Sequence, residues 1–248
     1  MKPYVAILVG LALGSVLLGA CGGGGGDAGK TPTASPYAPT IDRARFSDQV
    51  INRYFPLTPG TTYVYEGTKE GAAQRNEVTV TRDTKTILGV RCVVVHDTVM
   101  EEGSVVEDTF DWYAQDSDGN VWYFGEDSKE YENGKVISTE GSWEAGVDGA
   151  QPGIVMEASP KVGDSYRQEY YQGEAEDMAK VLKINESTTV SAGSYEQVVV
   201  TEDFTPLEPD VVEHKYFAPG VGFVAGSMVK GGSEQIELVK ITVEITTD

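Results

Sequence analysis

The sequence has few of the residues that most catalytic and metal centres need. Its 248 residues include only two cysteines, Cys21 and Cys92, and two histidines, His96 and His214. So few cysteines exclude a disulfide framework. A metal site of three imidazoles is excluded too, and a Ser-His-Asp arrangement would have to use one of the two histidines. Cys92 lies in a β-branched run, so we expect a small buried hydrophobe and not a nucleophile.

The signature motifs of the familiar enzyme classes are also absent. No G-x-S-x-G, H-E-x-x-H, C-x-x-C, P-loop or dinucleotide-binding pattern occurs. Acidic residues are so abundant that a pair of carboxylates has almost no diagnostic value. We therefore expect a non-catalytic protein and keep a hydrolase with a carboxylate site as an alternative.

Basic residues are scarce. Lys and Arg number 19 against 39 Asp and Glu, which gives a formal net charge of −20 at pH 7. Such an acidic surface repels nucleic acid and anionic lipid headgroups and attracts cations. The balance excludes nucleic acid as a partner and favours solubility outside the cell, with a cation-related function as the alternative.

No apolar run reaches the ~20 residues that a membrane-spanning helix needs. The run Tyr4–Gly19 follows a short basic start and ends in Leu18-Gly19-Ala20-Cys21, which is typical of an export signal. These last four residues resemble the lipobox of bacterial lipoproteins. The resemblance implies that residues 1–20 are removed and that Cys21 carries diacylglycerol on its thiol and an acyl chain such as palmitate on its amine. More than one acyl chain gives a stable membrane anchor.

Residues 21–40 differ in composition from the rest of the chain. Five glycines, Gly22–Gly26, lead into a stretch rich in Gly, Pro, Ser, Thr and Ala, with too few apolar residues to pack. We expect a disordered tether between the lipid anchor and a single β domain over residues 41–248. Gly22 stands where many lipoproteins of the inner membrane have aspartate. The resemblance therefore implies the cell envelope, and the outer membrane in a bacterium with two membranes.

From Tyr54 onward, short β-branched and aromatic segments alternate with Gly, Pro, Asn and Asp. This pattern predicts strands joined by turns, without the long helices of a parallel sheet. We expect an all-β domain, a single antiparallel curved sheet of roughly ten to twelve strands in a half-barrel, a barrel or a sandwich, after one short helix or coil within residues 41–53. The predicted strands are Thr61–Glu66, Glu77–Asp83, Val90–Asp97, Val105–Ala114, Val121–Phe124, Lys135–Glu140, Tyr166–Tyr171, Met178–Glu186, Gln197–Phe204, Val211–Phe217, Val221–Val229 and Glu234–Thr246.

All three tryptophans lie in the stretch Phe110–Trp143. Asp118-Gly119-Asn120 and Asn133-Gly134 within it each predict a hairpin. In the first hairpin, apolar residues such as Trp112 alternate with Asp111 and its neighbours. This alternation predicts one face that buries aromatics and one that stays in water.

Two irregular regions are also informative. The apolar alternation of the last strand slips at Val239, which predicts a β-bulge. Residues 141–165 are rich in Gly and Pro and predict a long surface connection.

Three motifs resemble a family of uncharacterised exported bacterial β-rich lipoproteins. They are F-P-L-x-P-G-x-x-Y-x-Y at residues 55–65, Lys161-Val162-Gly163-Asp164, and Y-F-A-P-G-V-G at residues 216–222. The likeness covers about residues 54–240, and a looser likeness is to half-barrels of lipoprotein-carrier type. It implies the fold and the location, and brings neither an activity nor catalytic residues. Local physical chemistry also explains two of these motifs independently of any family. The prolines at residues 56 and 59 stiffen the chain before the first strand, and Pro219-Gly220 suits a type II turn.

The first hairpin carries the best local candidates for a metal site. Asp116, Asp118 and Asn120 lie in its turn, and Glu126 and Asp127 follow on the far side. Carboxylates two residues apart beside a turn can converge on calcium, although the spacing is not that of an EF-hand. A calcium-binding or calcium-stabilised structural lipoprotein is therefore an alternative, and no other cofactor is expected.

A second acidic group comprises Glu169 and the loop Gly173–Asp177. If the sheet curls, these carboxylates could meet Glu213 and His214. Charged loops are otherwise solvated, and both interpretations stay open.

The leading hypothesis is a non-catalytic, lipid-anchored domain that binds a ligand or partner, a small molecule or a protein, at the cell surface or in the periplasm. We expect Tyr113, Trp122, Tyr123 and Trp143 to be exposed and to make the contacts. A carrier of apolar ligands or lipids is a further alternative, which a deep apolar cavity would support.

Overall fold

The structure is a computed structural model that describes residues 37–244. The predicted signal peptide, Cys21 and most of the tether lie outside these residues. A 3₁₀ turn, η1 (Arg43–Arg45), and the short strand β1 (Phe46–Ser47) form where a short helix or coil was expected. The Tyr37 hydroxyl already donates to the Pro152 carbonyl at 3.1 Å, so the packed region begins before residue 41. Within residues 37–244, no helix is long and apolar enough to cross a membrane.

The other strands follow one another with short turns. In chain order they are β2 (Thr61–Lys69), β3 (Ala72–Ile87), β4 (Val90–Glu101), β5 (Ser104–Asp116), β6 (Val121–Glu132), β7 (Lys135–Ser138), β8 (Trp143–Glu144), β9 (Gln151–Met156), β10 (Ser165–Arg167), β11 (Glu169–Tyr170), β12 (Met178–Val190), β13 (Gly193–Phe204), β14 (Val212–Ala218), β15 (Gly222–Lys230) and β16 (Glu234–Val243).

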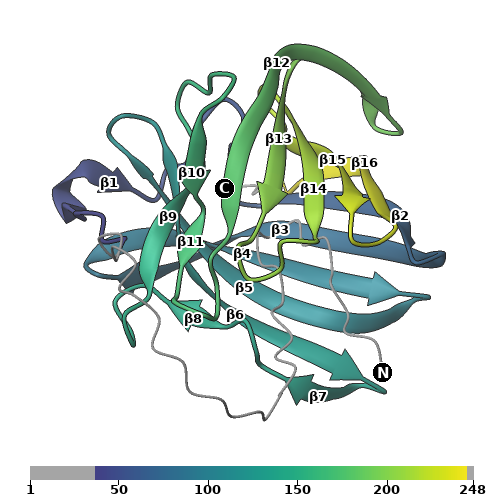
Figure 1. Ribbon diagram of the computed structural model, residues 1–248, viewed down its shortest axis with the longest axis horizontal. Helices are drawn as coiled ribbons and strands as arrows, with labels where there is room; N and C mark the ends of the chain where they lie inside the picture. The colour runs from purple at the N-terminus through teal and green to yellow at the C-terminus, as the bar shows by residue number, and fades with distance from the viewer. Residues whose placement is uncertain (1–36, 245–248) are drawn as a thin grey trace, which may run out of the picture.

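These strands form one antiparallel sheet in which neighbours in sequence are mostly neighbours in space. The order is β10-β12-β13-β14-β15-β16-β2-β3-β4-β5-β6-β9-β11, with β1 beside β5 and both β7 and β8 beside β6. β16 pairs with β2, which joins the last strand to the first long one. In Figure 1, β3–β6 run across the lower part of the view, and β12–β14 stand across them in the upper part.

The two ends of the sheet meet and nearly close it into a barrel. β10 pairs with β12 and β11 pairs with β9, while only Gln168 separates β10 from β11 in the sequence. Gly153 of β9 lies against the backbone of Gln168, and we call this contact the seam. A Cβ on Gly153 would lie 2.4 Å from the Gln168 carbonyl.

The all-β, antiparallel, curved sheet is confirmed, and its size and closure need correction. Sixteen strands within the described residues form this sheet, more than the roughly ten to twelve expected. The sequence predicted Tyr166–Tyr171 as one plain strand. That segment breaks at Gln168 and pairs with both ends of the sheet, which is why a half-barrel or a sandwich does not form.

Local signals placed the bulge and the late turn correctly. The register of β16 against β2 shifts between Leu238 and Lys240, which is the predicted bulge at Val239. Gly220 has a φ of +76°, and the Val221 amide donates to the Ala218 carbonyl at 3.2 Å, as a type II turn requires. The predicted surface connection over residues 141–165 is wrong in part, because β8 and β9 pair with β6 there. Glycine and proline interrupt these short strands, so the sequence does not show the alternation of apolar and polar residues that predicts a strand.

The inward face of the long strands changes character along the barrel. On β5, the inward residues run from Tyr113 through Asp111 and Thr109 to Glu107, and all four are buried. The interior is therefore aromatic at one end and acidic beyond it. The outward face of the same strands is buried as well where β1 covers it, with the Phe46 ring 5.6 Å from the Phe124 ring.

The seam provides a test of closure. In Gly153→Ala, the new methyl group meets backbone atoms of Gln168, which cannot rotate away. We expect the free energy of unfolding to fall by about 3 kcal/mol, the upper part of the usual cost of overpacking, in urea titrations. The control Gly134→Ala has a positive φ of +72° with nothing within 4 Å, and should cost only about 1 kcal/mol. Equal losses for both variants would show that the seam is not closely packed.

Candidate functional site

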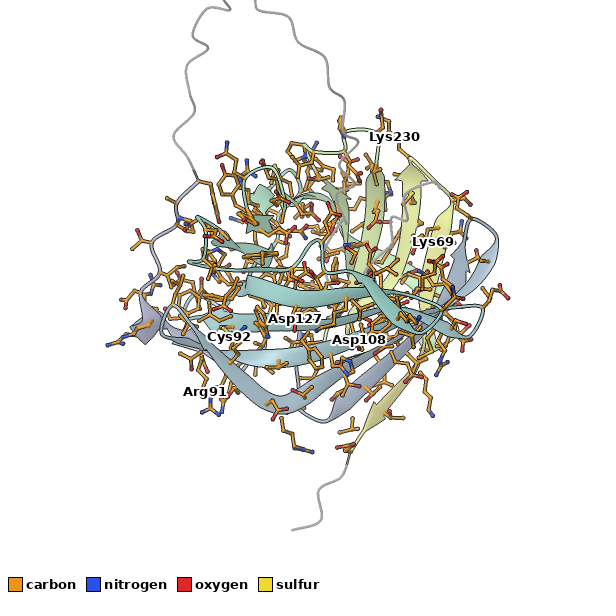
Figure 2. The ribbon with its side chains drawn as sticks, turned by 90° about the horizontal axis from the view of Figure 1, so that it is seen from below. Lys69, Arg91, Cys92, Asp108, Asp127 and Lys230 are labelled. Carbon is orange, nitrogen blue, oxygen red and sulfur yellow. The ribbon has the colours of Figure 1, made fainter. Side chains whose placement is uncertain are left out.

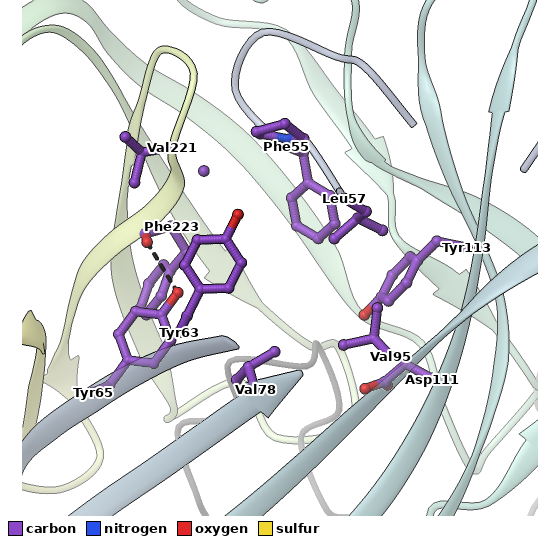
Figure 3. A pocket seen from close by; sticks show the side chains of 12 residues that line it. Phe55, Leu57, Tyr63, Tyr65, Val78, Val95, Asp111, Tyr113, Val221 and Phe223 are labelled. Carbon is purple, nitrogen blue, oxygen red and sulfur yellow. Dashed lines mark hydrogen bonds between the residues drawn. The ribbon is translucent and has the colours of Figure 1, made fainter. Parts of the chain in front are cut away.

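A cavity of about 40 Å³ lies at the aromatic end of the barrel interior (Figure 3). It is bounded by the segment before β2, by the inner faces of β2–β5 and by the start of β15, and it is partly open. We call it the aromatic cavity. Its lining includes Phe55, Leu57, Tyr63, Tyr65, Tyr113 and Phe223.

The rings around the cavity pack against one another. The Phe55 centroid lies 5.4 Å from that of Tyr113, and the Tyr65 centroid lies 5.3 Å from that of Phe223. The Tyr65 hydroxyl donates to the Phe223 carbonyl at 3.1 Å, the bond drawn in Figure 3. Aromatic contacts at these distances hold the rings in place, so the walls of the cavity are preformed.

Two of the motifs that carried the family resemblance meet at this cavity. The Gly220 amide donates to the Arg53 carbonyl at 2.7 Å, and the Leu57 amide donates to the Val50 carbonyl at 3.0 Å. The Asn52 side-chain oxygen accepts hydrogen bonds from the amides of Tyr54 at 2.8 Å and Phe55 at 3.1 Å. These bonds fasten the F-P-L motif beside the late P-G-V-G turn, and both motifs supply lining residues.

Asp111 is the single charged residue among the described residues that line the cavity. Its Oδ1 accepts a hydrogen bond from the Tyr123 hydroxyl at 2.6 Å, and its Oδ2 has no hydrogen-bond partner within residues 37–244. Burial raises the pKa of Asp111 to about 7, and the bond from Tyr123 opposes that rise. A carboxyl group thus faces an aromatic cavity with one oxygen unused.

Beyond Asp111, the interior holds far more acids than bases. Among the described side chains, nine carboxyl groups and two lysines are buried. The acids are Asp97, Glu107, Asp111, Glu126, Glu169, Asp177, Asp203, Glu213 and Glu234, and the bases are Lys69 and Lys215. Several kcal/mol are lost for each bare charge that enters a protein interior, so most of these carboxyls need a partner or a proton.

Asp111, Glu126 and Glu169 form what we call the carboxyl cluster. Glu126 of β6 lies opposite Asp111 of β5, and the Trp143 indole donates to Glu169 Oε2 at 2.8 Å. Neither oxygen of Glu126 has a hydrogen-bond partner in the described part of the chain. Burial, and then the neighbouring negative charges, raise the pKa of Glu126 well above its usual value. The pKa of Glu169 is raised by the same causes.

The two buried lysines form ion pairs with carboxyls outside the carboxyl cluster. Lys215 Nζ lies 3.2 Å from Asp203 and 3.6 Å from Glu213. Lys69 Nζ lies 3.7 Å from Glu101 (Figure 2). Although Lys215 lowers it, burial still raises the pKa of Glu213 to about 8. The polar end is thus partly neutralised, whereas the carboxyl cluster is not.

The side chains of the five residues proposed for calcium do not share a common centre in the structure. Asp116 accepts hydrogen bonds from the Trp122 indole and from the amides of Asp118 and Asn120. Asp118 binds Arg45 at 2.7 Å, and the exposed Asp127, labelled in Figure 2, binds Lys129 at 2.9 Å. Glu126 points into the barrel. The structure therefore brings only Asp116 and Asn120 into contact, because the Asn120 side-chain amide donates to Asp116 Oδ2 at 2.9 Å. No group of three His, Cys, Asp or Glu within residues 37–244 could hold a metal ion.

The expected exposure of the four aromatics is corrected. Tyr113, Tyr123 and Trp143 are buried, and Trp122 is half-buried against Phe46. The sequence also predicted that the face of β5 with Asp111 stays in water. The barrel encloses that face, and Asp111 is 0% exposed. Of these aromatics, Tyr113 lines the cavity, so it remains a candidate ligand contact.

The second acidic group does converge in part. Glu169 and Asp177 are buried, and the negative charge of Asp177 contributes to the raised pKa values of Glu126 and Glu213. Residues 173–176 lie in a loop, and His214 points away from the interior, 3.8 Å from Glu202. Curling of the sheet therefore gathers the strand carboxyls and leaves out the loop and the histidine. Cys92 is a buried hydrophobe as predicted, and burial raises the pKa of its thiol to about 12.

A second hollow of about 550 Å³ lies on the outer face, between the end of β12 and strands β2, β15 and β16. Its two carboxylates already have partners. Glu66 binds Arg75 at 2.6 Å, and Glu237 accepts from the Ser191 hydroxyl at 2.5 Å. This groove is larger than the aromatic cavity, and its charged groups are satisfied.

A scan against protein-family models finds no match, and a search of curated proteins finds none either. Solved structures are similar in fold. A Bacteroides fragilis protein inferred to be exported, with a YmcC-like fold, is 14% identical with a TM-score of 0.46, over 77% of this chain and 99% of that chain. A Parabacteroides distasonis protein inferred to be a lipoprotein is 13% identical with a TM-score of 0.42, over the same shares.

The buried acids make the stability depend on pH. In the unfolded chain they ionise near pH 4, whereas the folded-state pKa is about 7 for Glu107 and Asp111 and about 8 for Glu213. Folding therefore favours the protonated forms. The stability that these groups contribute is fully present below about pH 4 and is lost as the pH rises through 7 to 8. We expect urea midpoints to fall from pH 5 to pH 8.

Glu126→Gln tests the contribution of the cluster. The amide keeps the shape and cannot ionise, so the variant should lose less stability than the wild type between pH 5 and pH 8. Glu132→Gln, at an exposed position of the same strand, should follow the wild type. A wild-type midpoint that rises over this range would contradict the assignment of protonated carboxyls.

Proposed function

We propose that this protein is an exported, lipid-anchored barrel that binds a small organic cation in its aromatic cavity, with Asp111 as the counter-ion. The observation that carries the proposal is Asp111 itself, a buried carboxyl with an unused Oδ2 in an aromatic wall. The lipobox at Leu18–Cys21 supports attachment to the cell envelope through Cys21. An outer-membrane location follows by analogy in a bacterium with two membranes.

A cation suits this cavity for two physical reasons. A buried carboxylate is costly alone, and an ammonium group that donates to Oδ2 removes that cost. The faces of nearby aromatic rings attract a cation by about 0.5–2 kcal/mol each, more when water is excluded. Tyr63, Tyr65 and Tyr113 lie around the same space as Asp111. A neutral ligand of equal size gains neither contribution.

The volume limits the ligand. A cavity of about 40 Å³ holds a group of one or a few heavy atoms. Ligand pockets for drug-sized molecules measure about 300–1,000 Å³. A primary ammonium group with its first carbons suits the space, and the acyl chain of a lipid does not. The carrier of apolar ligands is therefore the weaker alternative.

Binding is tested by thermal unfolding of the full chain in detergent, with ethylammonium chloride as the ligand. At one hundred times the dissociation constant, a ligand stabilises the folded state by about 2.7 kcal/mol. We therefore expect the melting temperature to rise by about 5–10 °C. Ethanol, a neutral molecule of similar size, and sodium chloride at equal ionic strength should leave it unchanged.

The variant Asp111→Asn should abolish the response to ethylammonium, because the amide has no charge. Its matched control is Asp83→Asn, at an exposed position of β3, which should respond like the wild type. Equal stabilisation of Asp111→Asn and wild type would refute the role of Asp111. A rise with ethanol as large as with ethylammonium would favour the apolar carrier.

A further inference from the structure

The counter-ion of the proposed site is not an isolated group. Asp111 and Glu126 lie directly opposite each other on β5 and β6, where Cβ atoms of paired residues are about 4.5–5.5 Å apart. Asp111 Oδ2 and both oxygens of Glu126 have no hydrogen-bond partner among the described residues. Two buried carboxyls this close cannot both carry a charge without a large cost, so one of the pair keeps its proton.

No positive group in the described structure takes the place of that proton. The charged groups near the cluster on neighbouring elements are themselves acids. Glu107 of β5 and Asp177 before β12 act on Glu126, Asp97 of β4 acts on the nearby Tyr113, and Glu130 of β6 lies opposite Glu107. The positive charge of Lys69 acts on Glu107 and that of Lys215 on Glu213. A metal ion has no suitable group of three ligands within residues 37–244. Protons are the remaining means of neutralising the cluster.

We infer that a cation binds at Asp111 in exchange for a proton of the carboxyl cluster, so that the barrel holds its ligand at neutral pH and releases it in acid. The inference rests on the proposed function and specifies how that site is regulated. The exchange is balanced in charge. An ammonium ion enters, one carboxyl O–H of the Asp111–Glu126 pair breaks, the proton leaves to water, and the carboxylate stays with the ammonium.

Linkage sets the size of the effect. If one proton is released for each ligand bound, the dissociation constant increases tenfold for every pH unit below the range in which the pair titrates. Ethylammonium keeps its charge from pH 6 to pH 8, as lysine does, so the ligand itself adds no pH dependence there.

The exchange is measured by isothermal titration calorimetry of the full chain in detergent with ethylammonium chloride. Titrations at one pH in phosphate and in Tris, two buffers with different heats of ionisation, give the number of protons released. We expect close to one proton per ligand at pH 6.5, and a dissociation constant at least fivefold weaker at pH 6 than at pH 7. In Glu126→Gln, both the proton release and the pH dependence should decrease, while Glu132→Gln should match the wild type.

The outcomes separate the two proposals. Saturable binding with no proton release and a constant dissociation constant would overturn the exchange and leave the cation site intact. No binding at either pH would overturn both. Because proton release is measured on the wild type, the test stands even if Glu126→Gln fails to fold.

Discussion

The excess of carboxyl groups inside the barrel is the constraint on which the rest of the structure depends. Nine buried acids face two buried lysines among the described side chains. The sheet can close around them only if each acid finds a hydrogen bond, a lysine or a proton. The Tyr123 hydroxyl and the Trp143 indole each satisfy one oxygen of the carboxyl cluster, and Lys215 satisfies acids at the polar end. The remaining oxygens of the cluster depend on protons or on a ligand.

The aromatic end of the interior supplies the proposed binding site. The segment around Phe55 is held by hydrogen bonds to Val50 and to the turn at Gly220, so the two ends of the β domain meet where Asp111 faces the cavity. A net charge of −20 concentrates cations around the molecule, and the cavity then selects by size and by the single counter-ion. Surface charge and interior charge favour the same class of ligand.

The sequence allowed the fold class, most strands, the bulge at Val239 and the turn at Pro219-Gly220 to be predicted, because period-2 alternation and turn residues are local signals. The prediction that Asp111 faces water was wrong, because an acid that alternates with aromatic residues usually lies on the solvent-facing side of a strand. The closure at Gln168 and the pairing of Asp111 with Glu126 depend on register between strands. Register cannot be derived from one strand alone. Glu169 and Glu213, far apart in sequence, both lie within the electrostatic reach of Asp177 only because the sheet curls.

The protonation state of the carboxyl cluster tests this account most directly. Infrared spectroscopy distinguishes a protonated carboxyl from a carboxylate, and carbon-13 labelling of Glu and Asp assigns the bands to these side chains. The account predicts a protonated carboxyl band at pH 7 that weakens in Glu126→Gln and when ethylammonium chloride is added to the wild type. A wild-type spectrum at pH 7 with carboxylate bands alone would contradict it.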